Sequence, residues 1–141
     1  MGGVMQMGDE QNAETVGRLF EAFGRGDIPG AMEFFAEDVD FRSPVTRIHH
    51  QALTWARPRH GREEVRRFFG EMAAEVRPEP FEVLTLVARD DMVAVEGRNR
   101  GTVNATGVQF VHDWAMFFSF RDGRIVRCYH YYDTADLLAA F

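Results

Sequence analysis

The strongest constraint on the fold lies in the second half of the chain, where apolar and polar residues alternate over four successive segments. These segments cover residues 81–89, 92–100, 108–120 and 124–133, and turn sequences rich in Asp, Arg and Gly separate them. An alternation with a period of two is typical of β-strands, and short turns join antiparallel neighbours. The sequence therefore predicts an antiparallel meander that ends near Asp133.

The first half of the chain predicts helices instead. Apolar residues recur at helical spacing over residues 12–24, between Asp27 and Asp38, and over residues 61–76. We expect residues 1–11 to be a flexible tail and residues 12–141 to form a single domain, the number that suits 141 residues. Because the helices precede the strands, the predicted class is α+β, a cone-shaped barrel in which a curved antiparallel sheet wraps around three helices.

Three connecting segments carry further expectations. Val39 and Phe41 predict a brief strand, and residues 134–141 predict a last helical turn or two capped by Asp133 or Thr134. Between them, residues 43–60 show no period, and a loop of this length is often functional. Its Trp55, with His60, is expected either to close over a cavity as a lid or simply to pack the loop down.

The last hairpin decides which side chains face inward. A three-residue loop at residues 121–123 pairs Phe120 with Arg124 and places Trp114 opposite His130. A two-residue Asp-Gly turn would shift the pairing by one residue and send His130 to the face opposite Trp114. We prefer the first register because it gathers Trp, Met, Phe, Val and Cys on one face, which must then be the core.

This register places polar side chains inside the apolar face, namely Asn99, His112, His130 and Tyr132. Burial lowers the pKa of a histidine and leaves it neutral and able to accept a proton, while a tyrosine or asparagine can donate to a developing oxyanion. The predicted catalytic residues are His130 as base with Tyr132 and His112. The competing interpretation is that these groups only satisfy one another in the core.

Two acidic residues near the hairpin are candidates for structural roles. Asp113 is expected on the outer face, as a surface charge near Arg98 or Arg100. Asp133 is a candidate catalytic residue, but its interpretation as the N-cap of the C-terminal helix is slightly favoured.

Composition excludes several classes of protein. All 16 basic residues are arginine, which excludes a catalytic lysine, and neither serine lies in a G-x-S-x-G motif. Cys128 is the single cysteine and fits a reducing cytoplasm. A net charge of −6 without a basic run argues against nucleic acid, and no apolar stretch is long enough to cross a membrane. No metal site is predicted, since H-E-x-x-H is missing and adjacent His49 and His50 cannot easily share an ion.

Several short segments carry a resemblance that extends from about Glu14 to Phe141. They are Phe20 to Asp27, Phe34 to Val39, Gly61 to Val65 with Phe68-Phe69, Asp113-Trp114, Arg121 to Val126, and Tyr132-Asp133-Thr134. Together they resemble the SnoaL-like branch of the superfamily that includes nuclear transport factor two, ketosteroid isomerase and limonene-epoxide hydrolase. The resemblance implies a cone-shaped barrel with a hydrophobic pocket open at one end, and dimerisation through the outer sheet face.

The resemblance also bears on the chemistry. The positions of the three ketosteroid isomerase residues are occupied here by Leu19, Ser43 and Met116, so that steroid isomerisation is not expected. The acid/base aspartate of SnoaL-type cyclases matches Asp133 best. The residues expected to line the ligand pocket are Leu19, Phe20, Trp55, Phe68, Asn99, Trp114, Met116, Phe118 and Cys128.

The resulting hypothesis is a cofactor-independent acid/base enzyme of the isomerase, cyclase or hydratase type that acts on a small apolar ligand. The alternative is a non-catalytic ligand-binding or dimerisation module with the same fold. We expect no cofactor, no nucleic-acid or membrane partner, and a homodimer formed through the outer face around Phe117, Tyr129 and Tyr131.

Overall fold

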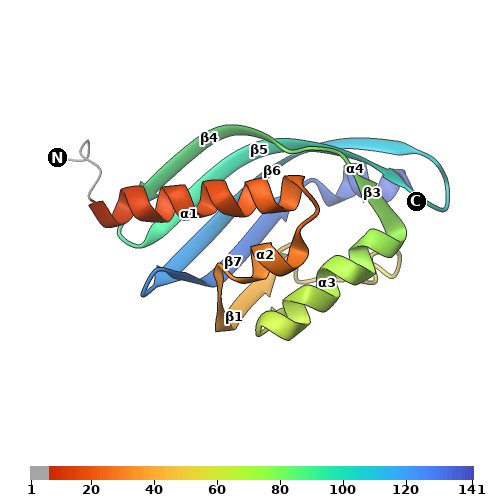
Figure 1. Cartoon of the computed structure of the whole chain (residues 1–141). Helices are drawn as coiled ribbons and strands as arrows, with labels where there is room; N and C mark the ends of the chain where they lie inside the picture. Colours follow the sequence, from red (N-terminus) through yellow and green to blue (C-terminus); the bar gives the residue numbers. More distant parts are fainter. Residues whose placement is uncertain (1–6) are drawn as a thin grey trace.

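A curved seven-stranded sheet encloses the helices of the N-terminal half in the computed structural model of the chain, which describes residues 7–141 (Figure 1). The helices are α1 (Met7–Gly24), α2 (Ile28–Met32), α3 (Arg62–Glu75) and α4 (Thr134–Ala139). The strands are β1 (Phe35–Arg42), β2 (Arg59–His60), β3 (Val76–Pro78), β4 (Glu82–Arg89), β5 (Met92–Val103), β6 (Gln109–Arg121) and β7 (Arg124–Tyr132). The predicted α+β class with a cone-like curved sheet is confirmed.

Helix α1 begins earlier than predicted. Residues 7–11, expected to belong to the flexible tail, are helical, whereas residues 1–6 lie outside the described part of the chain. Asp9 is buried and accepts a hydrogen bond from the backbone N–H of Asp90 at 3.0 Å, in the turn between β4 and β5. This contact ties the first turn of α1 to the sheet, which is why the helix extends beyond its apolar stripe.

Helix α2 is shorter than predicted, and β1 begins within the segment assigned to it. The Asp27 side chain caps the helix by accepting from the Gly30 N–H at 3.0 Å, but the helix ends at Met32. Phe35 is already in β1, where it pairs with Ile125 and is fully buried. A buried strand residue and a buried helix residue look alike in so short an apolar run.

The sheet has the strand order β2-β1-β7-β6-β5-β3, with β4 also paired to β5. The predicted meander is confirmed for β4 to β7, each antiparallel to the next. The sheet as a whole is mixed, however, because β1 runs parallel to β7. The sequence also did not predict β2 and β3, and β3 continues directly from α3 and pairs with the second half of β5.

The register of the last hairpin differs from the prediction. Asp122 and Gly123 both have positive φ, 53° and 77°, as in a two-residue primed turn. A β-bulge then adds Val126 to β7, so that Trp114 faces Tyr132 and Met116 faces His130. The bulge returns Cys128, His130 and Tyr132 to the predicted inner face, each paired with a β6 residue two positions from its predicted partner. The prediction for the start of β7 was wrong, because Ile125, expected on the outer face, is fully buried, whereas Val126, expected inside, is the extra residue of the bulge.

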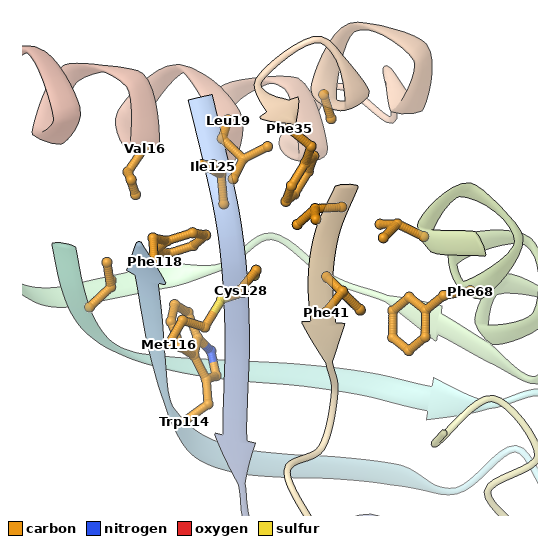
Figure 2. Close-up of a cluster of buried hydrophobic side chains, with 14 of the residues drawn as sticks. Val16, Leu19, Phe35, Phe41, Phe68, Trp114, Met116, Phe118, Ile125 and Cys128 are labelled. Atoms are coloured by element: carbon orange, nitrogen blue, oxygen red, sulfur yellow. The ribbon is translucent and has the colours of Figure 1, made fainter. Parts of the chain in front are cut away.

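The core lies between α1, α3 and the concave face of the sheet (Figure 2). Val16 and Leu19 project from α1 toward Phe118 and Ile125, and all four are fully buried. On the other side of the core, the rings of Phe41 in β1 and Phe68 in α3 meet with their centroids 4.8 Å apart. Burial of large side chains of this kind stabilises the fold by about 1.5–3 kcal/mol each.

The long segment between β1 and β2 is held down by its own tryptophan. Trp55 is 1% exposed, and its ring lies 5.8 Å from that of Phe141. The backbone oxygen of Trp55 accepts a hydrogen bond at 3.0 Å from Arg59, which is 2% exposed and forms an ion pair with Glu71. His60 is exposed. Of the two interpretations of this loop, the structure therefore supports packing.

Candidate functional site

Polar side chains from three strands and one loop position meet at one end of the apolar interior. His130 and Tyr132 come from β7 and their rings lie 4.7 Å apart, while His112 of β6 stacks on Tyr132 at 4.9 Å. The Trp114 ring meets that of His130 nearly at a right angle, 5.5 Å away. Asn99 of β5 is paired with His112 across the strands, as its predicted inward orientation required. We call His130, Tyr132, His112 and Ser43 the inner polar cluster.

Ser43 is the member that sequence reasoning did not assign to the site. It follows β1 directly, and the parallel pairing of β1 with β7 places it beside His130. The Ser43 hydroxyl lies 2.9 Å from His130 Nδ1, and the next turn of chain donates from Val45 N–H to the His130 carbonyl at 2.9 Å. Ser43 is 4% exposed. The bond to His130 fixes the orientation of the imidazole ring.

Burial sets the protonation of the cluster. It lowers the pKa of His130 to about 3, with a smaller contribution from His112, so that His130 is neutral at pH 7. It also lowers the pKa of His112, against the opposing effect of Asp136, Asp133 and Asp113. The pKa of Tyr132 is raised by burial to about 12, and the nearby polar side chains of Trp55 and Ser43 act on it in the opposite sense. The cluster is therefore uncharged, with a strongly held phenolic proton.

Several buried polar atoms of this region have no hydrogen-bond partner among the described residues: His130 Nε2, His112 Nδ1, Asn99 Oδ1, Trp55 Nε1 and Trp114 Nε1. Each such atom costs about 1–3 kcal/mol relative to a paired one. Buried polar atoms are nearly always paired, with protein or with ordered water. A group of them at one place is thus suited to a molecule that supplies the missing donors and acceptors.

The side chains predicted to line a pocket form packed core instead of an open cavity wall. Leu19, Phe118 and Cys128 are fully buried, and Trp55, Phe68, Trp114 and Met116 are at most 7% exposed. Phe20 is half-buried and packs against Trp114 at 5.8 Å and Phe118 at 6.1 Å. These contacts join Phe20, Trp114 and Phe118 into an aromatic layer, which reaches the inner polar cluster through the contact of Trp114 with His130.

Two depressions at the surface of residues 7–141 are lined by residues other than His130, His112 and Tyr132. One, of about 250 Å³, lies where β3 and β4 separate and is bordered by Phe81 and Asn99 together with Glu79, Pro80, Glu82, Arg98 and Arg100. Phe81 also contacts Phe20 and Trp114, with ring centroids 5.7 and 6.1 Å apart. This depression therefore reaches the aromatic layer from outside. The other, of about 380 Å³, lies at the start of α3 and is bordered by His60, Arg62 and Arg67 together with Glu37, Gly61, Glu63 and Glu64.

The two candidate aspartates lie apart from the cluster. Asp133 is exposed and accepts from the Asp136 N–H at 3.2 Å, which makes it the N-cap of α4. Asp113 is exposed on the outer face and bonds Arg98 at 2.8 Å, as predicted for a surface charge.

Residues 7–141 contain neither a metal-binding cluster nor a membrane-spanning helix. No group of three or more His, Cys, Asp or Glu side chains there is arranged to hold a metal ion. No helix in the described part of the chain combines the length and apolar character needed to cross a membrane.

Comparisons with known proteins agree with this architecture. A family model described as the SnoaL-like domain matches residues 16–128. A search of curated proteins found no match.

Among solved structures, an NTF2-like protein from Burkholderia xenovorans is 26% identical, covers 96% of this chain and 98% of its own, and has a TM-score of 0.80. A proposed polyketide cyclase from Xanthomonas campestris is 25% identical over 94% of this chain and 98% of its own, with a TM-score of 0.75. A protein of ketosteroid isomerase-like fold from Catenulispora acidiphila, solved with trimethylamine, shares the fold at 17% identity, covering 90% of this chain and 91% of its own, with a TM-score of 0.74.

Proposed function

Because this chain belongs to the SnoaL-like domain family, whose members share one scaffold for several activities, we propose its function from its own inner polar cluster. We propose a cofactor-independent acid/base enzyme that acts on a small apolar ligand bearing a carbonyl group. One observation carries the proposal: His130 Nε2 is buried beside the phenol of Tyr132 and has no hydrogen-bond partner within residues 7–141. A similar structure from Xanthomonas campestris, a proposed polyketide cyclase, supports chemistry on carbonyl compounds.

The chemistry follows from the protonation of the two side chains. Neutral His130 has a free ring nitrogen that can take a proton from the carbon next to a carbonyl. Tyr132 keeps its proton because burial raises the pKa of its phenol, and it can donate to the oxygen on which charge develops. His112, stacked on Tyr132, is proposed as a further polar contact, with Asn99 nearer the surface. Asp133 is not needed for this reaction, since it caps α4.

Access to the cluster is proposed through the depression between β3 and β4. Its border residue Asn99 is the cross-strand neighbour of His112, and Phe81 belongs to the aromatic layer over His130. Outward rotation of Phe81 and Phe20 would join the depression to the cluster. Its volume of about 250 Å³ suits a ligand of one or two rings.

The proposal is tested by hydrogen exchange of a ketone probe. 1-Indanone is incubated with the protein in D₂O, and the loss of its α-proton signal is followed by NMR. We expect the wild type to accelerate exchange above the buffer rate, His130→Gln to abolish the acceleration, and Tyr132→Phe to reduce it by on the order of 10²-fold or more. His60→Gln, which alters an exposed histidine, is the matched control and should exchange like the wild type.

An outcome in which 1-indanone and related aromatic ketones raise the melting temperature but show no accelerated exchange would favour the alternative, a binding module without chemistry. Acceleration that survives in His130→Gln would also refute the assignment of the base.

We also propose that the outer sheet face is covered by a second copy of this chain in the reducing cytoplasm. Phe117 and Tyr131 are 37% and 41% exposed there and pack edge to face at 5.8 Å, and Val87 and Met92 extend the apolar area over β4 and β5. Sedimentation equilibrium should give twice the mass of the chain for the wild type and a monomer for Phe117→Asp. A monomeric wild type at micromolar concentration would contradict this assembly.

A further inference from the structure

Two residues that face each other across β5 and β6 each bury a polar atom without a partner. Asn99 and His112 are directly opposite in the antiparallel ladder. Asn99 Oδ1 and His112 Nδ1 are both buried, and neither has a hydrogen-bond partner within residues 7–141. Residues directly opposite each other in such a ladder have Cβ atoms about 4.5–5.5 Å apart. A single small polar group of a ligand is therefore suited to contact both atoms.

The pair lies between the surface and the proposed catalytic residues. Asn99 borders the depression of about 250 Å³ between β3 and β4. His112 is 6% exposed, and its ring stacks on that of Tyr132 with the centroids 4.9 Å apart. A ligand that enters through this depression would meet Asn99 and His112 before it reaches Tyr132.

We propose that Asn99 and His112 bind a hydroxyl group of the ligand, so that the substrate is a cyclic ketone that also carries an alcohol or a phenol. This inference rests on the proposed function, because it names the substrate class of the same site. Asn99 and His112 are then specificity-determining residues, since they contact the ligand away from its carbonyl group.

The chemistry of the two buried atoms selects a hydroxyl. The oxygen of the Asn99 amide only accepts hydrogen bonds, so the ligand group must be a donor. His112 is neutral at pH 7 because burial lowers its pKa, and a neutral imidazole carries a hydrogen on one of its two nitrogens. A hydroxyl can donate to Asn99 Oδ1 and at the same time accept from His112 Nδ1–H.

Two other kinds of ligand group fit these atoms less well. A carbonyl or carboxylate oxygen cannot donate to Asn99 Oδ1. An ammonium group can donate to it, but cannot accept from His112 and would lose its hydration in this buried position. The charged residues that border the depression balance one another and favour neither sign of charge, with Glu79 and Glu82 against Arg98 and Arg100.

Tyr132 separates the proposed hydroxyl site from the proposed base. By the register of β6 and β7, the row of the sheet that holds Tyr132 lies between those of His112 and His130. The Tyr132 ring lies 4.9 Å from that of His112 and 4.7 Å from that of His130. A ligand of one or two rings can therefore present a hydroxyl at one end while its carbonyl group lies at the other.

The test compares two ketones that differ only in the group opposite the carbonyl, 5-hydroxy-1-indanone and 5-methyl-1-indanone. Their Kd values are measured by isothermal titration calorimetry at pH 7.5 in ordinary water. The wild type should bind the hydroxyl compound more tightly than the methyl compound. In Asn99→Leu, the ratio of the two Kd values should shift toward the methyl compound on the order of tenfold, the effect of one hydrogen bond.

Asn104→Leu is the matched control, because Asn104 is exposed in the turn between β5 and β6 and is not part of the depression. It should keep the wild-type ratio. Asn99→Ala removes the same amide if the leucine variant does not fold. In wild-type protein labelled with ¹⁵N-histidine, the hydroxyl compound should also shift the Nδ1 signal of His112 more than the methyl compound does, and His112→Gln identifies that signal.

An unchanged Kd ratio in the Asn99 variants, equal shifts of the His112 signal, or a wild type that binds neither compound would overturn the hydroxyl site. Binding is measured without any exchange reaction, so the two proposals fail separately. A preference for the hydroxyl compound that depends on Asn99, in a protein that does not accelerate ketone exchange, would support the hydroxyl site and refute the proposed catalysis.

Discussion

Acidification should destabilise the fold through His130, by an amount that the structure allows us to work out. The pKa of this histidine is about 3 in the folded chain against an ordinary value of 6.5, because burial disfavours the imidazolium. Between these two values the unfolded chain binds a proton that the folded chain does not, so stability is fully present above pH 6.5 and falls as the pH is lowered toward 3. At pH 5 this effect has lowered the free energy of unfolding by about 2 kcal/mol, because each pH unit below the ordinary pKa lowers it by 1.36 kcal/mol.

The pH window from 7.5 to 5 separates this effect from that of the carboxylates. Asp38, Glu63 and Glu71 have pKa values lowered by arginine partners, and their contribution to stability is lost only as the pH falls below their ordinary values of 3.8 to 4.5. The lowered pKa of His112 acts in the same window as His130, but its contribution is common to both proteins in the comparison below.

The assay is urea denaturation of wild type and His130→Gln at pH 7.5 and pH 5. The wild type should lose about 2 kcal/mol more than the variant over this interval, whatever the stability of the variant at pH 7.5. His60→Gln should lose as much as the wild type because His60 is exposed. Equal losses in wild type and His130→Gln would refute the argument that this imidazole is held neutral by burial.

Three further substitutions test the fold around the site. Gly97→Ala should lower the free energy of unfolding by roughly 3 kcal/mol or more in urea titrations, because the added methyl group would lie 2.3 Å from the Trp114 ring and 2.6 Å from a backbone oxygen of β4; a neutral result would mean that β4 can shift away. Glu71→Gln should lower the free energy of unfolding by roughly 2 kcal/mol, since Arg59 is buried and loses its charged partner. A decrease below about 0.5 kcal/mol would show that other groups satisfy the Arg59 guanidinium. Asp133→Ala should lower the free energy of unfolding by about 1 kcal/mol, because α4 loses its N-cap, while ketone exchange continues at the wild-type rate. Abolished exchange would show that Asp133 takes part in the reaction.

The inner face of the sheet could be predicted from the sequence because alternation along β6 and β7 is strong over many residues. His130 and Trp114 share that face in the structure, as predicted, although the pairing itself was wrong. Alternation is a local property of each strand, whereas the register depends on a bulge at Val126 that no local pattern marks. The order of helices and strands was likewise sufficient for the α+β class.

Ser43 and the short strands could not be predicted in the same way. Ser43 stands in a segment without a period, and its contact with His130 joins residues 87 positions apart. That contact exists because β1 runs parallel to β7, and parallel pairing arises from the path of the whole chain rather than from either strand. The three-residue strand β3 is too short to show alternation at all.

The bulge at Val126 acts as a phase shift of one residue inside the hairpin. If β7 paired without the bulge, so that Val126 rather than Arg127 lay opposite Ser119, every later residue of β7 would rotate to the opposite side of the sheet. His130 and Tyr132 would then face water, and Tyr129 and Tyr131 would be forced into the aromatic interior. The inward position of the imidazole thus depends on one valine near the turn staying out of the ladder, and removal of that residue altogether would leave every later pair as it is.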